Sequence, residues 1–419
     1  MFIQIHALQS FPPGNLNRDD RGQPKSALFG GVTRGRISSQ CLKRRMRESV
    51  AFEQLDRGVG VRTRQLPALV GSALRAAGNT GLDENRIKLI ELKIASAFKK
   101  DGGAPDDSAD EGVQTGQLVF FPKSFAALIA KTIVDAAGQK EGGLAEWLDG
   151  GSKKERKEKK PAKSAEAGEM EKRGKEHLID RAIKDASRLI TVDIGMFGRM
   201  TTSDLVEDVE AACQVAHAIS THEVRIERDY FTAMDDLARG KGAGFVSGGD
   251  SSTFFNSAVY YRYLNLDLHG LRRNVRIDGV DSHAMMSDSE LADAACALLN
   301  AVVHAGPTAK QNNFAAHSVP EFLICEISPL RQPLSYANAF LEAVALHGEG
   351  SLMARSAERL RGYVIDVASR FESAGLRRLA LAAGDARGTL ASAQIVERYA
   401  DLEQALRKEI TAGALARAR

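Results

Sequence analysis

The first residues of the chain alternate between apolar and polar side chains. Residues 2–9 follow this pattern, and Pro12-Pro13-Gly14 comes directly after them. Alternation with a period of two is typical of a strand, and a Pro-Pro-Gly run is typical of a turn. The pattern therefore predicts a first strand over residues 2–9 that ends at the prolines.

The same reading extends along the whole chain. Helical periodicity predicts helices over 39–50, 66–77, 83–100, 124–138, 175–188, 204–219, 288–304, 334–347, 353–372 and 392–411. Runs rich in β-branched and aromatic residues predict strands over 188–197, 223–232, 254–268 and 322–328. Strands interleaved with helices, together with one mostly helical block over about 51–187, indicate an α+β domain that carries an insertion.

Two segments have no periodic pattern. Residues 150–170 are a low-complexity run of charged and small residues, which predicts a solvated loop or a frayed helix. Contact of this loop with nucleic acid is the alternative. Residues 240–250 are rich in glycine but lack the order of a phosphate-binding P-loop, so they predict a flexible hairpin-like extension.

Composition narrows the class of protein. With 43% hydrophobic and 26% charged residues, the chain has the composition of a soluble globular protein with a real core. It has no run of about 18 apolar residues and no signal peptide, so no membrane contact is expected. Its four cysteines are widely spaced, which argues against a disulfide framework and a zinc ribbon. A cytoplasmic protein with free thiols is expected.

Net charge becomes informative only when it is divided along the chain. The total is +3, which excludes a wholly basic protein. Residues 1–50, however, contain nine Lys or Arg and three Asp or Glu, so this end of the chain is basic while the remainder is slightly acidic. Such a division predicts a local basic surface.

The predicted helix over 39–50 concentrates that charge. Gln40, Lys43, Arg44 and Arg47 are spaced so that they share one helical face, with apolar residues on the opposite face. Clustered cations repel one another, and a phosphate backbone relieves this repulsion while releasing counterions. A solvated helix surface is the alternative, but Glu48 is the one acidic neighbour.

The start of this helix extends the basic patch. Ser38 or Ser39 can cap the helix, and the first N–H groups of a helix bind phosphate. Cations that precede the helix add to the same patch, among them Arg18, Lys25, Arg34 and Arg36.

Other residue groups were considered for stacking or for catalysis. Tyr230 and Phe231 are adjacent aromatics, so in a strand one can pack inward while the other stacks on bases; two core aromatics are the alternative. The pairs Asp19-Asp20 and Asp235-Asp236 could hold Mg²⁺, although such loop carboxylates are usually solvated or paired. The histidines form no metal-binding motif, so no catalytic or metal site is predicted.

Several motifs resemble a known family. The segment from Leu16 to Arg47, with LNRDD, ALFGG and RGRISSQCLKRRMR in order, is similar to the N-terminal signature of the CasC family. This family supplies the repeated backbone subunit of Cascade, the type I-E CRISPR surveillance complex. The resemblance continues through VDIGMFGRMTTSD (192–204), QVAHAISTHEV (214–224), DYFTAMDDL (229–237), the strand over 254–268, AKQNNFAA (309–316) and LSYANAFLEAV (334–344). It is loose over about 51–187 and in the C-terminal tail.

The resemblance implies a fold and its parts. The family has an RRM-like (ferredoxin-like) palm, an inserted helical fingers domain and a β-hairpin thumb. Carried over to this chain, the palm comprises 1–50, 188–222 and 254–419, the last part with the C-terminal helices. The fingers comprise 51–187, with the charged loop 150–170, and the thumb comprises 223–253.

The resemblance also implies roles for individual residues. Contacts with the guide RNA are expected from Arg18, Lys25, Arg34, Arg36, Ser38, Gln40, Lys43, Arg44, Arg47, Arg199, Lys310 and Gln311. A wedge in the guide–target duplex is expected from Met200, which works with the thumb residues Tyr230, Phe231 and Thr232. Tyr230 stands where a relative has tryptophan, so the stacking area is smaller.

The implied function is a sequence-independent grip on CRISPR RNA (crRNA), which the subunit presents for pairing with target DNA in antiviral defence. The expected partners are crRNA, target DNA through the guide, further copies of the chain, the large and small subunits, the 5′-handle-binding subunit, the crRNA-processing endonuclease and a recruited helicase-nuclease. No enzymatic activity and no cofactor are expected. Two alternatives remain, namely a metal-dependent RNase that uses Asp19 or Asp20, and a stand-alone single-stranded RNA-binding protein.

Overall fold

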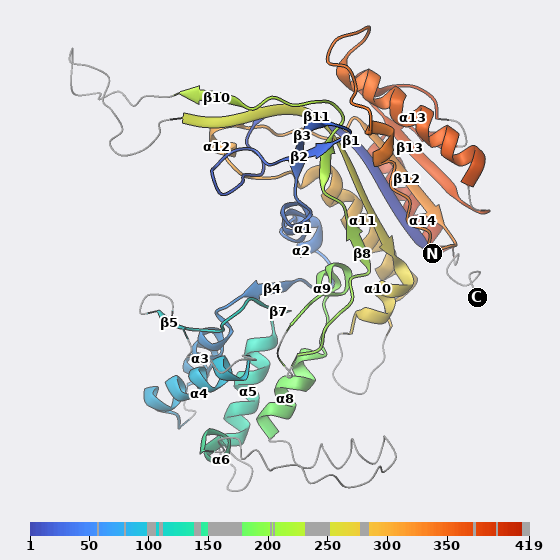
Figure 1. The fold of residues 1–419 in the computed structure, drawn as a ribbon. Coiled ribbons are helices and arrows are strands. Elements are labelled where there is room, and N and C mark those ends of the chain that lie inside the picture. Colours follow the sequence, from blue (N-terminus) through green and yellow to red (C-terminus); the bar gives the residue numbers. More distant parts are fainter. Residues whose placement is uncertain are drawn as a thin grey trace, which may run out of the picture. The chain divides into compact units, whose positions relative to one another are not determined.

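The computed structural model covers the whole chain. It describes residues 1–56, 58–78, 81–98, 106–108, 112–137, 144–149, 178–201, 203, 206–230, 252–276, 285–371, 374–390 and 393–412. Its contacts divide the chain into two compact units (Figure 1). Unit 1 comprises Met1–Leu55, Cys213–Gly270 and Met286–Arg419, and unit 2 comprises Asp56–Ala212 and Leu271–Met285. Residues 188–212, which we assigned to the palm, therefore fall in unit 2.

A large mixed sheet forms the centre of unit 1. Its strands follow the order β14-β13-β12-β1-β11-β9-β3-β2, and β8 and β10 also pair with β11. Their bounds are β1 Phe2–Gly14, β2 Ser26–Phe29, β3 Val32–Ile37, β8 Cys213–Val215, β9 Ala218–Ser220, β10 Glu227–Tyr230, β11 Ser252–Asp267, β12 Phe322–Ser328, β13 Arg377–Ala382 and β14 Ala393–Val396. All pairs are antiparallel except β13 with β14. The predicted mixture of helices and strands is confirmed.

The first strand is longer than predicted. It pairs with β11 from Phe2 opposite Asp267 to Gly14 opposite Asn256, so it runs through the two prolines. The register shifts between Phe11 and Gly14. Proline lacks an N–H for the ladder and is tolerated in a strand at such an irregularity. The proline run therefore marks a bulge in β1 and does not end it.

The two faces of this sheet carry different helices. Leu8 and Tyr261 pack in one apolar cluster with residues of α13 (Leu352–Phe371). On the other face, the neighbouring residues Gln9 and Arg262 lie toward α11 (Asp288–His304), because Arg262 donates a hydrogen bond to a carbonyl of that helix. Three more helices contact α11 directly or through one another: α1 (Ser39–Arg47), α2 (Val50–Glu53) and α14 (Tyr399–Thr411). The remaining described helices of unit 1 are α12 (Gln311–Phe314) and the 3₁₀ turns η1 (Ala337–Phe340) and η2 (Gly384–Ala386), while α10 (Leu268–Asn274) runs from unit 1 into unit 2.

Unit 2 is mostly helical and has its own core. It contains α3 Leu66–Ala76, α4 Glu84–Ala97, α5 Phe125–Ala137, α6 Leu144–Asp149, α8 Leu178–Ser187 and α9 Val192–Phe197. Two small antiparallel sheets of two strands pair β4 (Gly60–Thr63) with β7 (Val119–Pro122) and β5 (Asp106–Ser108) with β6 (Gly112–Gln114). Fully buried Leu66, Ile90 and Phe125 lie in one apolar cluster, as the helical periodicity of their segments requires.

Several predicted elements are confirmed and others are wrong. The helix over 288–304 and the strand over 322–328 match α11 and β12 residue for residue. The predicted strand over 188–197 is wrong for its larger part, because residues 192–197 form the helix α9, while Ile190 makes a single β-bridge with Arg276. The start of α9 is held by the carboxylate of Asp193, which accepts hydrogen bonds from the Thr191 hydroxyl and from the N–H groups of Ile194 and Gly60.

Two predicted helices are wrong and a third is shorter than predicted, because distant strands or anchors compete for the segment. Within the predicted helix over 204–219, residues 213–215 form β8 and residues 218–219 begin β9, and the backbone groups of both strands pair with β11. Of residues 334–347, only the 3₁₀ turn η1 is helical, and Tyr336 beside it is tied to Tyr261 and Glu326. The last helix begins at Tyr399, after β14, and β13 was missed. Short apolar runs do not distinguish strand from helix.

In the part of the chain that the structure describes, no helix is long and apolar enough to cross a membrane.

Candidate nucleic-acid interface

Helix α1 presents the predicted cationic face. The Ser38 hydroxyl caps the helix by accepting a hydrogen bond from the Cys41 N–H at 3.3 Å. Leu42 and Met46 are buried, with 2% and 0% of their surfaces exposed, so they dock the helix on unit 1. The opposite face is turned outward as a consequence. It carries the exposed Gln40 and Arg44 and the half-buried Lys43 and Arg47.

Glu48 moderates the charge at the end of this helix. Its carboxylate binds the guanidinium groups of Arg44 at 2.7 Å and Arg45 at 2.8 Å. Burial alone would raise the pKa of Glu48, but its bonds to Arg44 and Arg45 outweigh this effect and lower it. The side chain of Arg44 is 76% exposed, so solvent screens its pair with Glu48 and Arg44 stays accessible to a stronger anion, whereas Arg45 is 25% exposed.

A well-ordered loop leads into the helix. Asn17 accepts the N–H of Ser38 on its side-chain oxygen, at 2.9 Å, and the N–H of Lys25 on its carbonyl, at 2.8 Å. Asp19 Oδ1 accepts the N–H groups of Arg21 at 3.0 Å and Gln23 at 2.8 Å. These bonds fold residues 17–25 back on themselves and bring the exposed Arg18 beside the start of α1.

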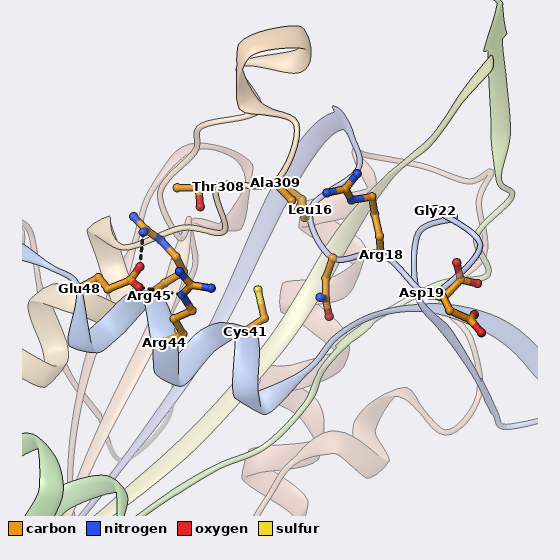
Figure 2. A pocket seen from close by; sticks show the side chains of 12 residues that line it. Leu16, Arg18, Asp19, Gly22, Cys41, Arg44, Arg45, Glu48, Thr308 and Ala309 are labelled. Atoms are coloured by element: carbon orange, nitrogen blue, oxygen red, sulfur yellow. Dashed lines mark hydrogen bonds and ion pairs between the residues drawn. The ribbon is translucent and has the colours of Figure 1, made fainter. Parts of the chain in front are cut away.

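Helix α1, this loop and a distant segment enclose a pocket of about 670 Å³ (Figure 2). Arg18 lies on one wall, Arg44 and Arg45 rise from α1 on another, and Thr308 and Ala309 close the top in this view. The complete lining is Leu16, Asn17, Arg18, Asp19, Asp20, Gly22, Cys41, Arg44, Arg45, Glu48, Thr308 and Ala309. Three guanidinium groups around one open pocket are suited to phosphate groups.

The segment that supplies Thr308 also carries Lys310 and Gln311. Lys310 has φ 55° and Ala315 has φ 47°, which are left-handed conformations on both sides of the short helix α12. The Gln311 side-chain amide donates to the Pro307 carbonyl at 2.9 Å, and Arg45 Nε donates to the Gly306 carbonyl at 3.1 Å. The predicted contacts Lys310 and Gln311 therefore lie next to the pocket wall.

Arg34 does not belong to this surface, which corrects the expectation that it contacts RNA. Its side chain is fully buried, and it donates to the carbonyls of Phe29, Ser220 and Phe340 at 3.2, 3.0 and 2.9 Å. Burial lowers the pKa of Arg34, and the charge of Glu223 only partly opposes this. A guanidinium held by three backbone carbonyls joins segments of unit 1 and is not free for a phosphate.

Arg199 is corrected for the same reason, within unit 2. It is 4% exposed and donates to the carbonyls of Glu207 at 2.9 Å and Ser187 at 2.8 Å. Burial lowers the pKa of Arg199 to about 10. Its function is to join three segments of unit 2, because it also donates to Phe120.

Arg36 remains near the surface beside the loop. It donates to the Ser26 carbonyl and lies 3.2 Å from Nδ1 of His217. Burial lowers the pKa of His217, and the positive charges of Arg36 and Lys25 lower it further. Arg36 and Lys25 therefore lie close enough to His217 to disfavour its charged form.

The predicted wedge residues are only partly described. Met200 is 89% exposed in unit 2, and Tyr230 is 60% exposed at the end of β10 in unit 1. Phe231 and Thr232 lie outside the described residues, as do residues 231–251 of the predicted thumb and the charged loop 150–170. An exposed methionine and an exposed tyrosine are available for contact with bases.

Reasoning from the sequence missed part of the pocket. Arg45 lies off the helical face formed by Gln40, Lys43, Arg44 and Arg47, and no local pattern indicates that the Asn17 side chain accepts the N–H of Ser38. Thr308 and Ala309 are more than two hundred residues from α1, and no local pattern links them to it.

Comparisons with known proteins show which structures this chain resembles and which family it belongs to. Among solved structures, a chain described as "CRISPR RNA-guided surveillance complex, pre-nicking" matches with a TM-score of 0.74 and 25% identity, over 98% of this chain and 100% of the other. A second, described as "CRISPR RNA-guided surveillance complex", shares the fold with a TM-score of 0.65 and 22% identity, over 97% of this chain and 99% of the other. The search of curated proteins finds no match. Residues 3–408 match the family described as CT1975-like protein, so the chain belongs to that family.

Proposed function

We propose that the protein is the crRNA-binding backbone subunit of a CRISPR RNA-guided surveillance complex of the Cascade class, type I-E. The observation that carries the proposal is the pocket that Arg18, Arg44 and Arg45 share beside the cationic face of α1. The likeness to a chain of a CRISPR RNA-guided surveillance complex over 98% of the sequence supports it.

The chemistry of the pocket suits a guide of any sequence. Arginine and lysine bind phosphate oxygens, which are identical at every nucleotide, so these contacts position RNA without reading it. The free N–H groups at the start of α1 add a further phosphate site. Target DNA is then selected by base pairing with the guide, as in other RNA-guided systems.

The proposal extends to assembly. Unit 1 corresponds to an RRM-like palm and unit 2 to the fingers, and copies of the chain follow one another along the crRNA. Exposed Met200 and Tyr230 supply apolar surfaces that wedge between base pairs, since methionine is flexible and aromatic rings stack on any base. The large and small subunits, the 5′-handle-binding subunit and the crRNA-processing endonuclease complete the complex, which recruits a helicase-nuclease.

The proposal assigns no catalysis to this subunit. Asp19 is one of the two aspartates that an RNase would use. Its Oδ1 already accepts hydrogen bonds from two loop N–H groups. Within the described ranges, no three His, Cys, Asp or Glu side chains gather in a metal-binding arrangement. Assembled complex with complementary RNA and Mg²⁺ should leave that RNA intact. Regularly spaced cuts that disappear in Asp20→Ala would overturn this assignment.

The decisive experiment removes two cations from α1. Lys43→Ala with Arg47→Ala should weaken binding of single-stranded RNA for every sequence tested. The slope of log affinity against log salt should fall by about 1.4, because each lost contact with a single strand removes about 0.7. Fluorescence anisotropy of labelled RNA across a salt series measures both quantities.

A matched control removes the same amount of positive charge from a different helix. Arg359→Ala with Arg370→Ala removes two surface arginines of α13, on the other face of the sheet. The control should bind RNA as the wild type does. Equal losses in the two double variants would mean that net charge, and not α1, controls binding. Copurification with one guide of uniform length and with other subunits separates the proposal from a stand-alone RNA-binding protein.

A further inference from the structure

Arg262 is a buried cation that the proposed site does not use directly. It lies on β11 and is 3% exposed, and burial lowers its pKa to about 10 with no acidic group opposing the effect. Nη1 donates to Gln9 Oε1 at 2.5 Å and to the Val302 carbonyl at 2.7 Å. Burying a charge without a counter-charge is costly. The position of Arg262 in the fold shows which segments its two hydrogen bonds connect.

One acceptor, Val302, lies at the start of a segment, and the other, Gln9, binds Ser318 at the end of the same segment. Val302 is in the last turn of α11, where carbonyls lack partners within the helix and a cation is favoured. Gln9, on the adjacent strand β1, uses its amide to donate to the Ser318 carbonyl at 2.8 Å. Arg262 and Gln9 together therefore tie residues 302 and 318 to the centre of the sheet.

The segment between these ties is held in an unfavourable backbone conformation. Lys310 and Ala315 both have positive φ, although neither is glycine. Such residues persist where surrounding contacts hold them, and they concentrate at functional sites. Here the same segment supplies Thr308 and Ala309 to the pocket and touches α1 through the bond from Arg45 to Gly306.

We propose that Arg262 is a positioning residue for RNA binding: through Val302 and Gln9 it holds the 303–317 segment so that Thr308 and Ala309 line the pocket beside α1 and Lys310 lies next to its wall. The inference rests on the proposed function, since it assumes that the pocket beside α1 binds RNA. Arg262 itself touches no RNA, and its effect on binding passes through the segment.

The test is a double-mutant cycle on the full-length chain with labelled single-stranded RNA of mixed sequence. Arg262→Met should weaken binding about tenfold in the wild-type background. In a Lys310→Ala background, the same change should weaken binding less than about twofold, because the contact that Arg262 positions is already lost. Arg262→Lys, which keeps a charged donor, should fall between wild type and Arg262→Met.

A second variant covers the case in which Arg262→Met does not fold. Gln9→Glu keeps an acceptor for Arg262 and gives it a counter-charge, but it removes the amide donor to Ser318. It should keep the chain folded and still weaken RNA binding. Hydrogen exchange should show faster exchange of amides within 308–318 in both variants and an unchanged rate in Lys310→Ala.

The possible results separate the two proposals. If the wild type binds no RNA, the proposed function fails. If the wild type binds RNA and Lys43→Ala with Arg47→Ala weakens binding, the function stands. The inference then fails if Lys310→Ala has no effect, if Arg262→Met has equal effects in both backgrounds, or if the folded Gln9→Glu variant binds and exchanges as the wild type does.

Discussion

Arg34 and Arg36 are two residues apart on β3, and their guanidinium groups have different surroundings. Arg34 is enclosed by the carbonyls of Phe29, Ser220 and Phe340, whereas Arg36 lies near the surface beside His217. A buried donor that loses its partner, or a carbonyl that loses its donor, costs about 1–3 kcal/mol. At the scale of single residues, then, one arginine serves stability while the other is available for a ligand.

Arg34→Ala should lower the free energy of unfolding by about 3 kcal/mol, since it removes the donor from the buried carbonyls of Ser220 and Phe340 and from the half-buried carbonyl of Phe29. Arg36→Ala should change that free energy by less than about 1 kcal/mol and weaken RNA binding instead. Chemical denaturation and RNA titration of both variants test this. An Arg34→Ala protein as stable as the wild type would contradict the structural role.

Glu326 provides a prediction on pH. Burial alone would raise the pKa of this carboxyl, but His6 and the guanidinium of Arg378 outweigh burial and hold it at about 2, below its ordinary value of 4.5. Ionised Glu326 therefore stabilises the fold above pH 5. This contribution, about 3 kcal/mol, should be lost as the pH falls from about 5 toward 2.

Glu326→Gln cannot ionise and serves as the comparison for that titration. It should be less stable than wild type at pH 7, because Arg378 loses its buried counter-charge, and its stability should depend less on pH between 5 and 3. Denaturant midpoints measured across this range give the slope directly. Equal slopes for wild type and variant would assign the acid sensitivity to other groups.

At the scale of elements, the start of α1 connects fold and site. The Ser38 hydroxyl accepts the Cys41 N–H, while its own N–H donates to Asn17 in the preceding loop. One residue thus joins the loop that carries Arg18 to the helix that carries Arg44. The Ser39 hydroxyl, in contrast, donates to the side-chain oxygen of the neighbouring Gln40 at 3.4 Å and does not cap the helix.

Ser38→Ala should therefore lower the free energy of unfolding by about 1 kcal/mol, the usual cost of losing an N-cap. Ser39→Ala, one residue away, should have almost no effect and is the matched control. RNA affinity should fall with Ser38→Ala, because the first turn of α1 loses its fixed geometry. Thermal denaturation and anisotropy compare the two variants, and identical behaviour would remove Ser38 from the capping role.

At the scale of the whole molecule, the sheet of unit 1 separates two surfaces. The helices α1 and α11 belong to the face of Gln9 and Arg262, and α13 belongs to the face of Leu8 and Tyr261. The pocket that we propose to bind RNA therefore lies on the face of Gln9 and Arg262. The other face, with α13 and its ion pairs, is free for other contacts within a complex.

RNA bound to the full chain should leave a one-sided pattern of hydrogen exchange. Amides within 16–25, 39–47 and 305–316 should exchange more slowly with RNA than without it, while α13 and β13 should not change. The physical reason is that bound RNA shields amides and restrains the loops it contacts. Protection centred on α13 would place the RNA on the other face of the sheet and would refute RNA binding at the pocket beside α1.

Much of the fold could be predicted because its signals are local. The ends of α11 follow from the capping box of Ser287 and Glu290 and from the period of its apolar residues. The segments β8, β9 and η1 were mispredicted because their conformation depends on partners in β11 and on anchors such as Tyr336. Local periodicity contains no information about such partners.

Some features of the candidate site likewise follow from local sequence, and others depend on tertiary contacts. By itself the sequence determined that α1 is amphipathic and capped at Ser38 or Ser39, and that its outer face is cationic, because helix geometry converts spacing directly into a face. Only the tertiary structure decided which cations remain available. It encloses Arg34 and Arg199 among backbone carbonyls from distant segments, and it brings Thr308 beside Arg18 and Arg44. These are long-range contacts, which arise when the chain packs and which no local pattern of residues contains.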